Sequence, residues 1–234
     1  MQAVILAGGQ GTRLRPLTDK VPKAMITIGG KPFIEHQMAL LKKNSVDDLV
    51  ICTGCGGDII QRHLGDGELF GVRVRYSDDG EQLLGTAGSL KKAKDLLSEY
   101  FFVTFGDAYP IIDYKAAYRR FLATGKAALM VVNKNSDRQG RSNTVVQDGL
   151  VTFYSKSEKT EGMDYIEFGV TFMRKRAIEL IPNETPVDLE VLYRQIIAKN
   201  EMAALEVNQR IYDIGSLAGL NEFRSLVETG RLPF

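Results

Sequence analysis

The chain alternates short, almost continuously apolar runs with stretches that show the 3.6-residue period of amphipathic helices. Strands that are buried on both faces read as unbroken apolar runs, and parallel strands need a crossover connection, usually a helix. The alternation therefore predicts an α/β protein with a mostly parallel sheet covered by helices on both faces. The expected strands are residues 2–7, 47–53, 72–77, 100–105 and 126–132.

The pattern changes after about residue 134. The stretch "SNTVVQDGLVTFYSKSE" predicts two strands joined at Asp148-Gly149, a dipeptide typical of tight hairpins. A strand in "DYIEFGVTFM", helices near 174–181 and 187–199, a strand over 202–207 and a terminal helix follow. Because no repeat or long linker interrupts the chain, we expect one domain, residues 1–234, with halves 1–133 and 134–234.

The charge balance limits the classes of partner. Thirty basic and 29 acidic residues leave a net charge of +1. We therefore expect no nucleic-acid or membrane partner, and an anionic ligand has to be held by local cations. No apolar run approaches membrane-spanning length and no basic leader carries a cleavage site, which predicts a cytoplasmic protein.

The cysteines and histidines carry little functional signal. Cys52 and Cys55 have the spacing of a redox pair or half a zinc site, but the chain contains no second cysteine pair. We interpret Cys52 as a buried strand residue and Cys55 as a turn residue. His36 and His63 fall in helical stretches and are interpreted as packing or surface residues.

The loop after the first strand, "GGQGTR", predicts a phosphate site. Its glycines let the backbone approach a ligand and direct amides at phosphate oxygens. It lacks the third glycine of G-x-G-x-x-G and the Gly-Lys-Ser/Thr ending of the Walker loop. Arg13 instead supplies a planar charge, and Lys23, which follows Pro22, supplies another. Asp107, in "GDAY", follows a later strand, so we expect it at the same carboxyl edge.

These residues carry a family resemblance. "LAGGQGTRLRPLTDKVPKAM" resembles the signature of the sugar-1-phosphate nucleotidylyltransferases, with Ala24 where the family usually has proline. "LLGTAGSL" (83–90), "FVTFGDAY" (102–109) and "IYDIGSLAGL" (211–220) are similar to further family segments in the same order. The resemblance implies a Rossmann-like, three-layer α/β/α (GT-A-like) nucleotidyltransferase fold with a mostly parallel mixed sheet. It also implies a nucleotide-binding half (1–133), a small sugar-binding subdomain in the second half (134–234) and no C-terminal β-helix.

The resemblance also implies a reaction. In this family, a sugar 1-phosphate attacks the α-phosphorus of a nucleoside triphosphate, pyrophosphate leaves, and an NDP-sugar forms for polysaccharide or cell-envelope synthesis. Arg13 would steady the β- and γ-phosphates, and Lys23 would bridge the α-phosphate and the incoming phosphate. Asp107 and Asp213 would hold Mg²⁺, and Asp107 completes the catalytic set. Taken singly, each aspartate could instead be a turn residue.

Two groups of binding residues follow from the same motifs. Lys156 stands where the family has a lysine that holds the sugar phosphate. Its neighbours Ser155 and Ser157 replace the family's glutamate and proline, so Lys156 could instead be a solvated surface lysine. The nucleotide-binding residues are expected to be Leu6, Ala7, Gly8, Gly9, Gly11, Thr12, Arg13, Lys23, Gln82, Gly85 and Thr86. The sugar-phosphate-binding residues are expected to be Gly106, Asn143, Lys156, Glu167 and Gly169.

The substrates are less constrained. The compact chain and its "LGTAG" segment look most like those of the short heptose-1-phosphate guanylyltransferases and of the MurNAc- and mannose-1-phosphate enzymes. Guanine is therefore the slightly preferred base. A homodimer is compatible with this resemblance. The alternatives are cytidylyl transfer to a phosphorylated alcohol or amino compound, a nucleotide-sensing homologue without turnover, and a NAD-dependent dehydrogenase. The last needs an acidic residue at the end of the second strand, where Cys52 and Thr53 stand.

Overall fold

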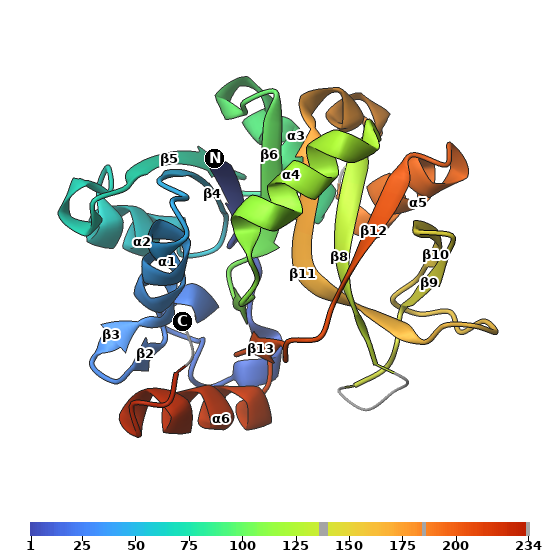
Figure 1. The fold of residues 1–234 in the computed structure, drawn as a ribbon. Coiled ribbons are helices and arrows are strands. Elements are labelled where there is room, and N and C mark those ends of the chain that lie inside the picture. The colour runs from blue at the N-terminus through green and yellow to red at the C-terminus, as the bar shows by residue number, and fades with distance from the viewer. Residues whose placement is uncertain (136–139, 184–185, 233–234) are drawn as a thin grey trace.

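The computed structural model describes residues 1–135, 140–183 and 186–232. Nine strands form one sheet in the order β5-β4-β1-β6-β11-β8-β12-β10-β9 (Figure 1). Residues from both predicted halves contribute to this sheet. Its strands are β1 (Gln2–Leu6), β4 (Asp48–Thr53), β5 (Arg73–Asp78), β6 (Tyr100–Phe105), β8 (Ala128–Lys134), β9 (Thr144–Gln147), β10 (Leu150–Tyr154), β11 (Tyr165–Arg174) and β12 (Met202–Val207).

The sheet is mixed. Strands β5, β4, β1 and β6 pair in parallel, as the alternation predicts. Strand β11 is antiparallel to both of its neighbours, β6 and β8, so the strand expected over 126–132 does not join the parallel set directly. Strands β8 and β12 pair in parallel, and β10 and β9 close the edge in antiparallel pairs.

Helices cover both faces of the sheet (Figure 1). In β1, Ala3 and Ile5 belong to a core with helices α1, α2 and α4, whereas Val4 and Leu6 belong to a core with α3 and α5. Since successive strand side chains point to opposite faces, this division confirms a three-layer arrangement. The helices are α1 (Phe33–Lys43), α2 (Gly57–Leu64), α3 (Gly85–Lys92), α4 (Tyr114–Thr124), α5 (Leu189–Ala198) and α6 (Leu217–Glu228).

Local sequence signals explain most helix ends. Asp113, Asp188 and Ser216 each accept a hydrogen bond from a backbone amide in the first turn of α4, α5 and α6. Thr86 is of a residue type that often caps helices, but it does not cap its own helix, because α3 begins at Gly85 and has no side-chain cap. Five short 3₁₀ segments are also present: Thr12–Leu14, Lys23–Met25, Glu68–Phe70, Ala93–Leu96 and Lys175–Leu180, the last in place of the helix expected near 174–181.

The predictions for the hairpin, the two cysteines and His36 are confirmed. The β9–β10 hairpin turns at Asp148 and Gly149, with φ of 49° and 75°, as a tight two-residue turn requires. Cys52 is a buried free cysteine and Cys55 an exposed one. His36 lies in α1 and its ring contacts the carbonyl of Ile28. Within the described ranges, no helix is long and apolar enough to cross a membrane.

Two small sheets complete the carboxyl edge of the large one. Strands β2 (Thr27–Ile28) and β3 (Lys31–Pro32) form a hairpin. Strands β7 (Ala108–Tyr109) and β13 (Tyr212–Asp213) pair in antiparallel fashion, and the Ile214 amide donates to the Asp107 carbonyl at 2.9 Å. The last described segments of the chain are thereby joined to the loop that follows β6, below the sheet in Figure 1.

Candidate active site

The glycine loop leaves β1 at the carboxyl edge of the sheet. Gly8 lies against the backbone of Thr53 and Gly54 after β4, so close that a Cβ would sit 3.4 Å from that backbone. Gly11 has a φ of +64° and faces Thr18, whose hydroxyl donates to the Gly11 carbonyl at 2.9 Å. Gly9 has nothing within 4 Å of its Cβ position. The loop is therefore fixed at both ends and open to a ligand in its middle.

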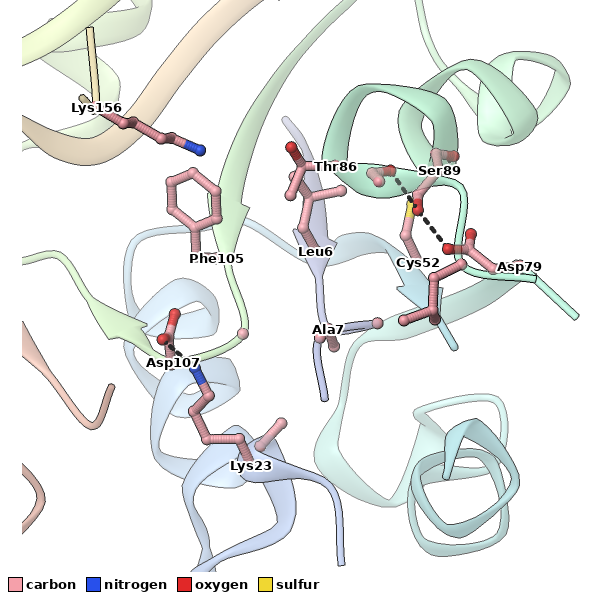
Figure 2. Close-up of a pocket in the computed structure, with 16 residues that line it drawn as sticks. Leu6, Ala7, Lys23, Cys52, Asp79, Thr86, Ser89, Phe105, Asp107 and Lys156 are labelled. Atoms are coloured by element: carbon pink, nitrogen blue, oxygen red, sulfur yellow. Dashed lines mark hydrogen bonds and ion pairs between the residues drawn. The ribbon is translucent and has the colours of Figure 1, made fainter. Parts of the chain in front are cut away.

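Lys23 and Asp107 form the strongest contact at this edge. The Lys23 Nζ lies 2.6 Å from Asp107 Oδ2, and the two side chains are only 19% and 23% exposed. Asp107 follows β6, and the amide of the intervening Gly106 donates to the Leu6 carbonyl at 2.9 Å. The sequence predicted that these residues share an edge, and Figure 2 shows the ammonium group directed at the carboxylate.

Gly215 marks the point where three predicted charged residues converge. A Cβ at this glycine would lie 3.0 Å from Asp213 Oδ1, 3.1 Å from Asp107 Oδ2 and 3.1 Å from the Arg13 guanidinium. The Gly215 amide donates to Asp213 Oδ1 at 2.8 Å, which fixes that carboxylate. The structure therefore brings Arg13, Lys23, Asp107 and Asp213 together from four separate segments.

The donor set fits a magnesium ion. Mg²⁺ prefers oxygen ligands and keeps several waters, so one or two carboxylates together with substrate phosphates are sufficient. Asp107 and Asp213 present carboxylate oxygens to one point beside Gly215. Among the described residues, no group of three or more His, Cys, Asp or Glu side chains could hold a metal. The two aspartates thus form half of a site that phosphates would complete.

A cavity of about 320 Å³ lies between the glycine loop and α3; we call it the first cavity. Lys23 and Asp107 stand at one end of it, and Asp79 and Ser89 stand at the other (Figure 2). Its lining also includes Leu6, Ala7, Gly8, Gly9, Ala24, Cys52, Leu83, Gly85, Thr86, Phe105, Gly106 and Lys156.

The wall at Gly85 is built by a segment distant in sequence. Gly85 has a φ of +75°, and a Cβ there would lie 2.5 Å from the Val187 carbonyl oxygen. The hydroxyl of Thr86 accepts from the Leu189 amide at 2.7 Å and donates to Asp188 Oδ2 at 3.2 Å. Thr86 therefore helps to begin α5 rather than its own helix.

Lys156 reaches the first cavity from the second half of the chain. Its Nζ lies 2.7 Å and 2.9 Å from the two oxygens of Asp188, and its side chain is 41% exposed. Burial raises the pKa of Asp188, but hydrogen bonds from Lys156 and from the Glu190 amide outweigh it and hold that pKa below its usual value. Lys156 is thus held at the cavity by an acidic partner.

A second cavity, of about 620 Å³, shares Phe105 and Asp107 with the first. Asn143, Glu167, Gly169 and Asp213 contribute to its lining. Asn143 Oδ1 accepts from the Glu167 amide at 2.9 Å, and Gly169 has a φ of +75° where β11 becomes irregular. Of the predicted sugar-phosphate residues, these three line the second cavity and Gly106 and Lys156 line the first.

Glu167 is oriented by two tyrosines. Tyr154 donates to Oε2 at 2.8 Å and Tyr193 donates to Oε1 at 3.2 Å, so each carboxylate oxygen has a donor. Burial raises the pKa of Glu167, and the hydrogen bond from Tyr154 and the charge of Lys156 offset part of that rise. Its geometry is therefore set before any ligand binds.

Some predicted binding residues do not line the first cavity, and some residues of the site were not predicted. Gly11, Thr12 and Gln82 are not among the described residues that line the first cavity. Arg13 lines the second cavity instead. Gln82 is exposed. No role was predicted for Asp79, Asp188, Tyr154, Tyr193 or Gly215. Asp79 comes two residues after the strand predicted over 72–77, and that position was the signal that could have found it.

The fold and the converging charged residues define a nucleotidyltransferase class of protein, and comparison with known proteins agrees. Residues 2–229 match the Nucleotidyl transferase family. The chain belongs to this family, so the predicted family and fold class are confirmed.

Two relatives match the chain over nearly its full length. It is 29% identical to the D-glycero-alpha-D-manno-heptose 1-phosphate guanylyltransferase of Campylobacter jejuni, over 92% of this chain and 95% of the relative. It is also 29% identical to the N-acetylmuramate alpha-1-phosphate uridylyltransferase of Neisseria meningitidis, over 97% of this chain and 98% of the relative. Other relatives are longer: the chain spans 53% of a UTP–glucose-1-phosphate uridylyltransferase from Synechocystis.

A solved structure confirms the architecture. HddC from Yersinia pseudotuberculosis, determined in complex with GMP-PN, superposes with a TM-score of 0.79 at 25% identity. The match covers 97% of this chain and 99% of HddC.

Proposed function

We propose that the protein is a sugar-1-phosphate nucleotidylyltransferase, which transfers a nucleotidyl group from a nucleoside triphosphate to a sugar 1-phosphate and releases pyrophosphate. The observation that carries the proposal is the shared wall of the two cavities: Asp107 and Phe105 line both. A nucleotide in the first cavity and a sugar phosphate in the second would meet at Asp107. The names of the relatives support the same reaction.

The charged residues at that meeting point fit the reaction. Both reactants are anions, so catalysis requires positioning and charge neutralisation more than a general base. Lys23 can contact the α-phosphate and the attacking phosphate, since it already lies 2.6 Å from Asp107 at the junction. Arg13, beside Asp107 and Asp213, can hold the departing pyrophosphate in a bidentate contact. The backbone of Gly8 and Gly9 would hold the remaining phosphate oxygens.

Asp107 and Asp213 would hold Mg²⁺ beside Gly215. A bound magnesium ion supplies charge neutralisation and polarisation at the phosphate oxygens. Lys23 pairs with Asp107. We therefore infer that Lys23 turns from this carboxylate to phosphate when substrates and the ion arrive.

The acceptor site would lie in the second cavity. Glu167 and Asn143 present polar groups to sugar hydroxyls, and Gly169 leaves room for close approach of the ring. Lys156, held by Asp188, lines the first cavity, so it would contact the acceptor phosphate where that group enters beside the nucleotide. The halves 1–133 and 134–234 would then bind nucleotide and sugar phosphate respectively.

The proposal extends to the base, the product and the cellular compartment. Guanine is our preferred base, supported by the GMP-PN complex of HddC and by the guanylyltransferase of C. jejuni. The product would be an NDP-sugar for polysaccharide or cell-envelope synthesis, made in the cytoplasm, where nucleoside triphosphates are available. A homodimer is compatible with the proposal.

The proposal is tested by pyrophosphate release with Mg²⁺ over a matrix of five nucleoside triphosphates and a panel of sugar 1-phosphates, including heptose, mannose, glucose and MurNAc. We expect at least one pair to release pyrophosphate and to yield the corresponding NDP-sugar. If a triphosphate binds and no pair reacts, the nucleotide-sensing alternative holds instead. Lys23→Met serves as a control, since it should abolish release.

A further inference from the structure

Asp79 is a wall residue of the first cavity for which the proposed reaction gives no role. It follows β5 and is only 7% exposed. Its Oδ2 accepts hydrogen bonds from the Ser89 hydroxyl at 2.7 Å and from the Leu84 amide at 3.1 Å. Its Oδ1 is covered from solvent and has no hydrogen-bond partner among the described atoms. Figure 2 shows Asp79 at the end of the cavity opposite Lys23 and Asp107.

The orphaned oxygen is held in place. The Asp79 amide donates to the Thr53 carbonyl at 2.9 Å, and Lys92 Nζ lies 3.3 Å from the Asp79 carbonyl. A buried acceptor without a donor is costly, and its free energy improves when a donor reaches it. Because Asp79 lies on the wall of a ligand cavity, we infer that the missing donor belongs to the ligand.

The cavity around Asp79 suits a flat ring. Leu6, Cys52 and Leu83 contribute apolar wall, and apolar walls with a few fixed polar groups are typical of small-molecule sites. An ionised carboxylate only accepts hydrogen bonds, so the ring edge that meets Asp79 must carry N–H groups. Burial together with Asp79 raises the pKa of the Cys52 thiol to about 12, so this side chain adds no charge to the wall.

The five common bases differ at that edge. Guanine presents a ring N–H beside an exocyclic amino group, so both groups are donors. In adenine and cytosine the amino group adjoins a ring nitrogen that accepts, and in uracil and thymine the ring N–H lies between two carbonyls. On the Watson–Crick edge, guanine is therefore the only one of the five bases that offers a carboxylate two adjacent N–H donors.

We propose that Asp79 selects the base, with Oδ1 accepting a hydrogen bond from the N1–H and 2-amino edge of guanine. This inference rests on the proposed function and names the nucleotide that it uses. Since Oδ1 is covered from solvent, the wall must open when the base enters. Leu83 is only partly buried and lies outside any helix or strand, so it can move without disturbing the sheet.

The substitution Asp79→Asn gives a test with a predicted gain. The Leu84 amide can only donate, so it holds the amide oxygen of the asparagine at the position of Oδ2. The amide NH₂ then takes the place of Oδ1 and meets the 2-amino group of guanine, donor against donor. Xanthine carries a carbonyl at that position and accepts from the NH₂. The variant should therefore prefer XTP to GTP.

The experiment measures dissociation constants of GTP, XTP, ITP, UTP, CTP and ATP with Mg²⁺ by calorimetry, which requires no knowledge of the acceptor. We expect wild type to bind GTP at least roughly tenfold more tightly than XTP or ITP, because losing this hydrogen bond leaves a buried polar group unpaired; tenfold corresponds to about 1.4 kcal/mol. Asp79→Asn should reverse the order of GTP and XTP. Asp78→Asn is the matched control, because Asp78 is adjacent, exposed and outside the cavity lining.

Three outcomes separate the claims. If Asp79→Asn keeps the wild-type order of GTP and XTP, or wild type prefers a pyrimidine or ATP, the assignment of Asp79 is overturned and the proposed function stands. If no triphosphate binds, the proposed function fails with it. If wild type binds ITP as well as GTP, the 2-amino group is not read, and this comparison is independent of whether the variant folds.

Discussion

Gly215 offers the sharpest perturbation of the charged junction. In Gly215→Ala, the new methyl group would lie 3.0 Å from Asp213 Oδ1 and 3.1 Å from both Asp107 Oδ2 and the Arg13 guanidinium. Ordinary contacts of carbon begin near about 3.5 Å, so each of these groups has to retreat by roughly 0.4 Å. The methyl group also occupies the point at which both carboxylates converge.

The magnitude follows from that displacement. Misplacement of reacting groups by about 1 Å costs on the order of 100-fold, so we expect kcat to fall roughly 10- to 100-fold, with a higher Mg²⁺ requirement. Gly215 does not have a positive φ, so alanine strains no backbone there. The free energy of unfolding should therefore change by less than about 1 kcal/mol.

The assay is pyrophosphate release with the reactive substrate pair as Mg²⁺ is varied, together with a thermal melt of each variant. Leu217→Ala is the control, because Leu217 is 54% exposed at the start of α6 and should leave both quantities unchanged. Wild-type kcat and Mg²⁺ dependence in Gly215→Ala would refute the convergence of catalytic groups at this point.

Three further outcomes are expected. Gly85→Ala should lower Tm by about 2–8 °C, because its Cβ would meet the Val187 carbonyl at 2.5 Å with φ at +75°; an unchanged melt contradicts that packing. Asp213→Asn should raise the Mg²⁺ concentration for half-maximal activity without unfolding the protein, and an unchanged requirement removes it as a ligand. Glu167 has a raised pKa, so its contribution to stability is present below the unfolded pKa and is lost as pH rises through the folded pKa. Urea denaturation should therefore show Glu167→Gln gaining stability relative to wild type above about pH 4.3, the usual glutamate value; parallel stability curves contradict this.

Local signals in the sequence predicted the parts of the structure that local chemistry controls. The apolar runs located β1, β4, β6 and β8 because burial on both faces leaves no room for polar residues. Strand β5 lies at the edge of the sheet and keeps exposed charged residues. Asp148-Gly149 located the hairpin because few residues adopt two successive positive φ angles. The glycine loop, Lys23 and Asp107 were placed at one edge because parallel strands share their carboxyl ends.

Features that depend on contacts distant in sequence were missed. Asp188 reads as the N-cap of α5, and nothing nearby in the sequence indicates that it also holds Lys156, 32 positions earlier. Nothing near Thr86 in the sequence indicates that its hydroxyl accepts from the Leu189 amide 103 positions later. The hydrogen bonds of Asp79 Oδ2 with Ser89 and Leu84, and the unpaired Oδ1, are properties of the folded cavity that the sequence does not indicate.

Nucleotide and acceptor are expected to meet between the two cavities at Asp107. A crystal structure with a non-hydrolysable GTP analogue and Mg²⁺ would show whether they do. We expect the base in the first cavity beside Asp79 and Gly85, the α-phosphate within reach of Lys23, and the metal on Asp107 and Asp213. A triphosphate bound away from the glycine loop, or a metal that contacts neither aspartate, would contradict it.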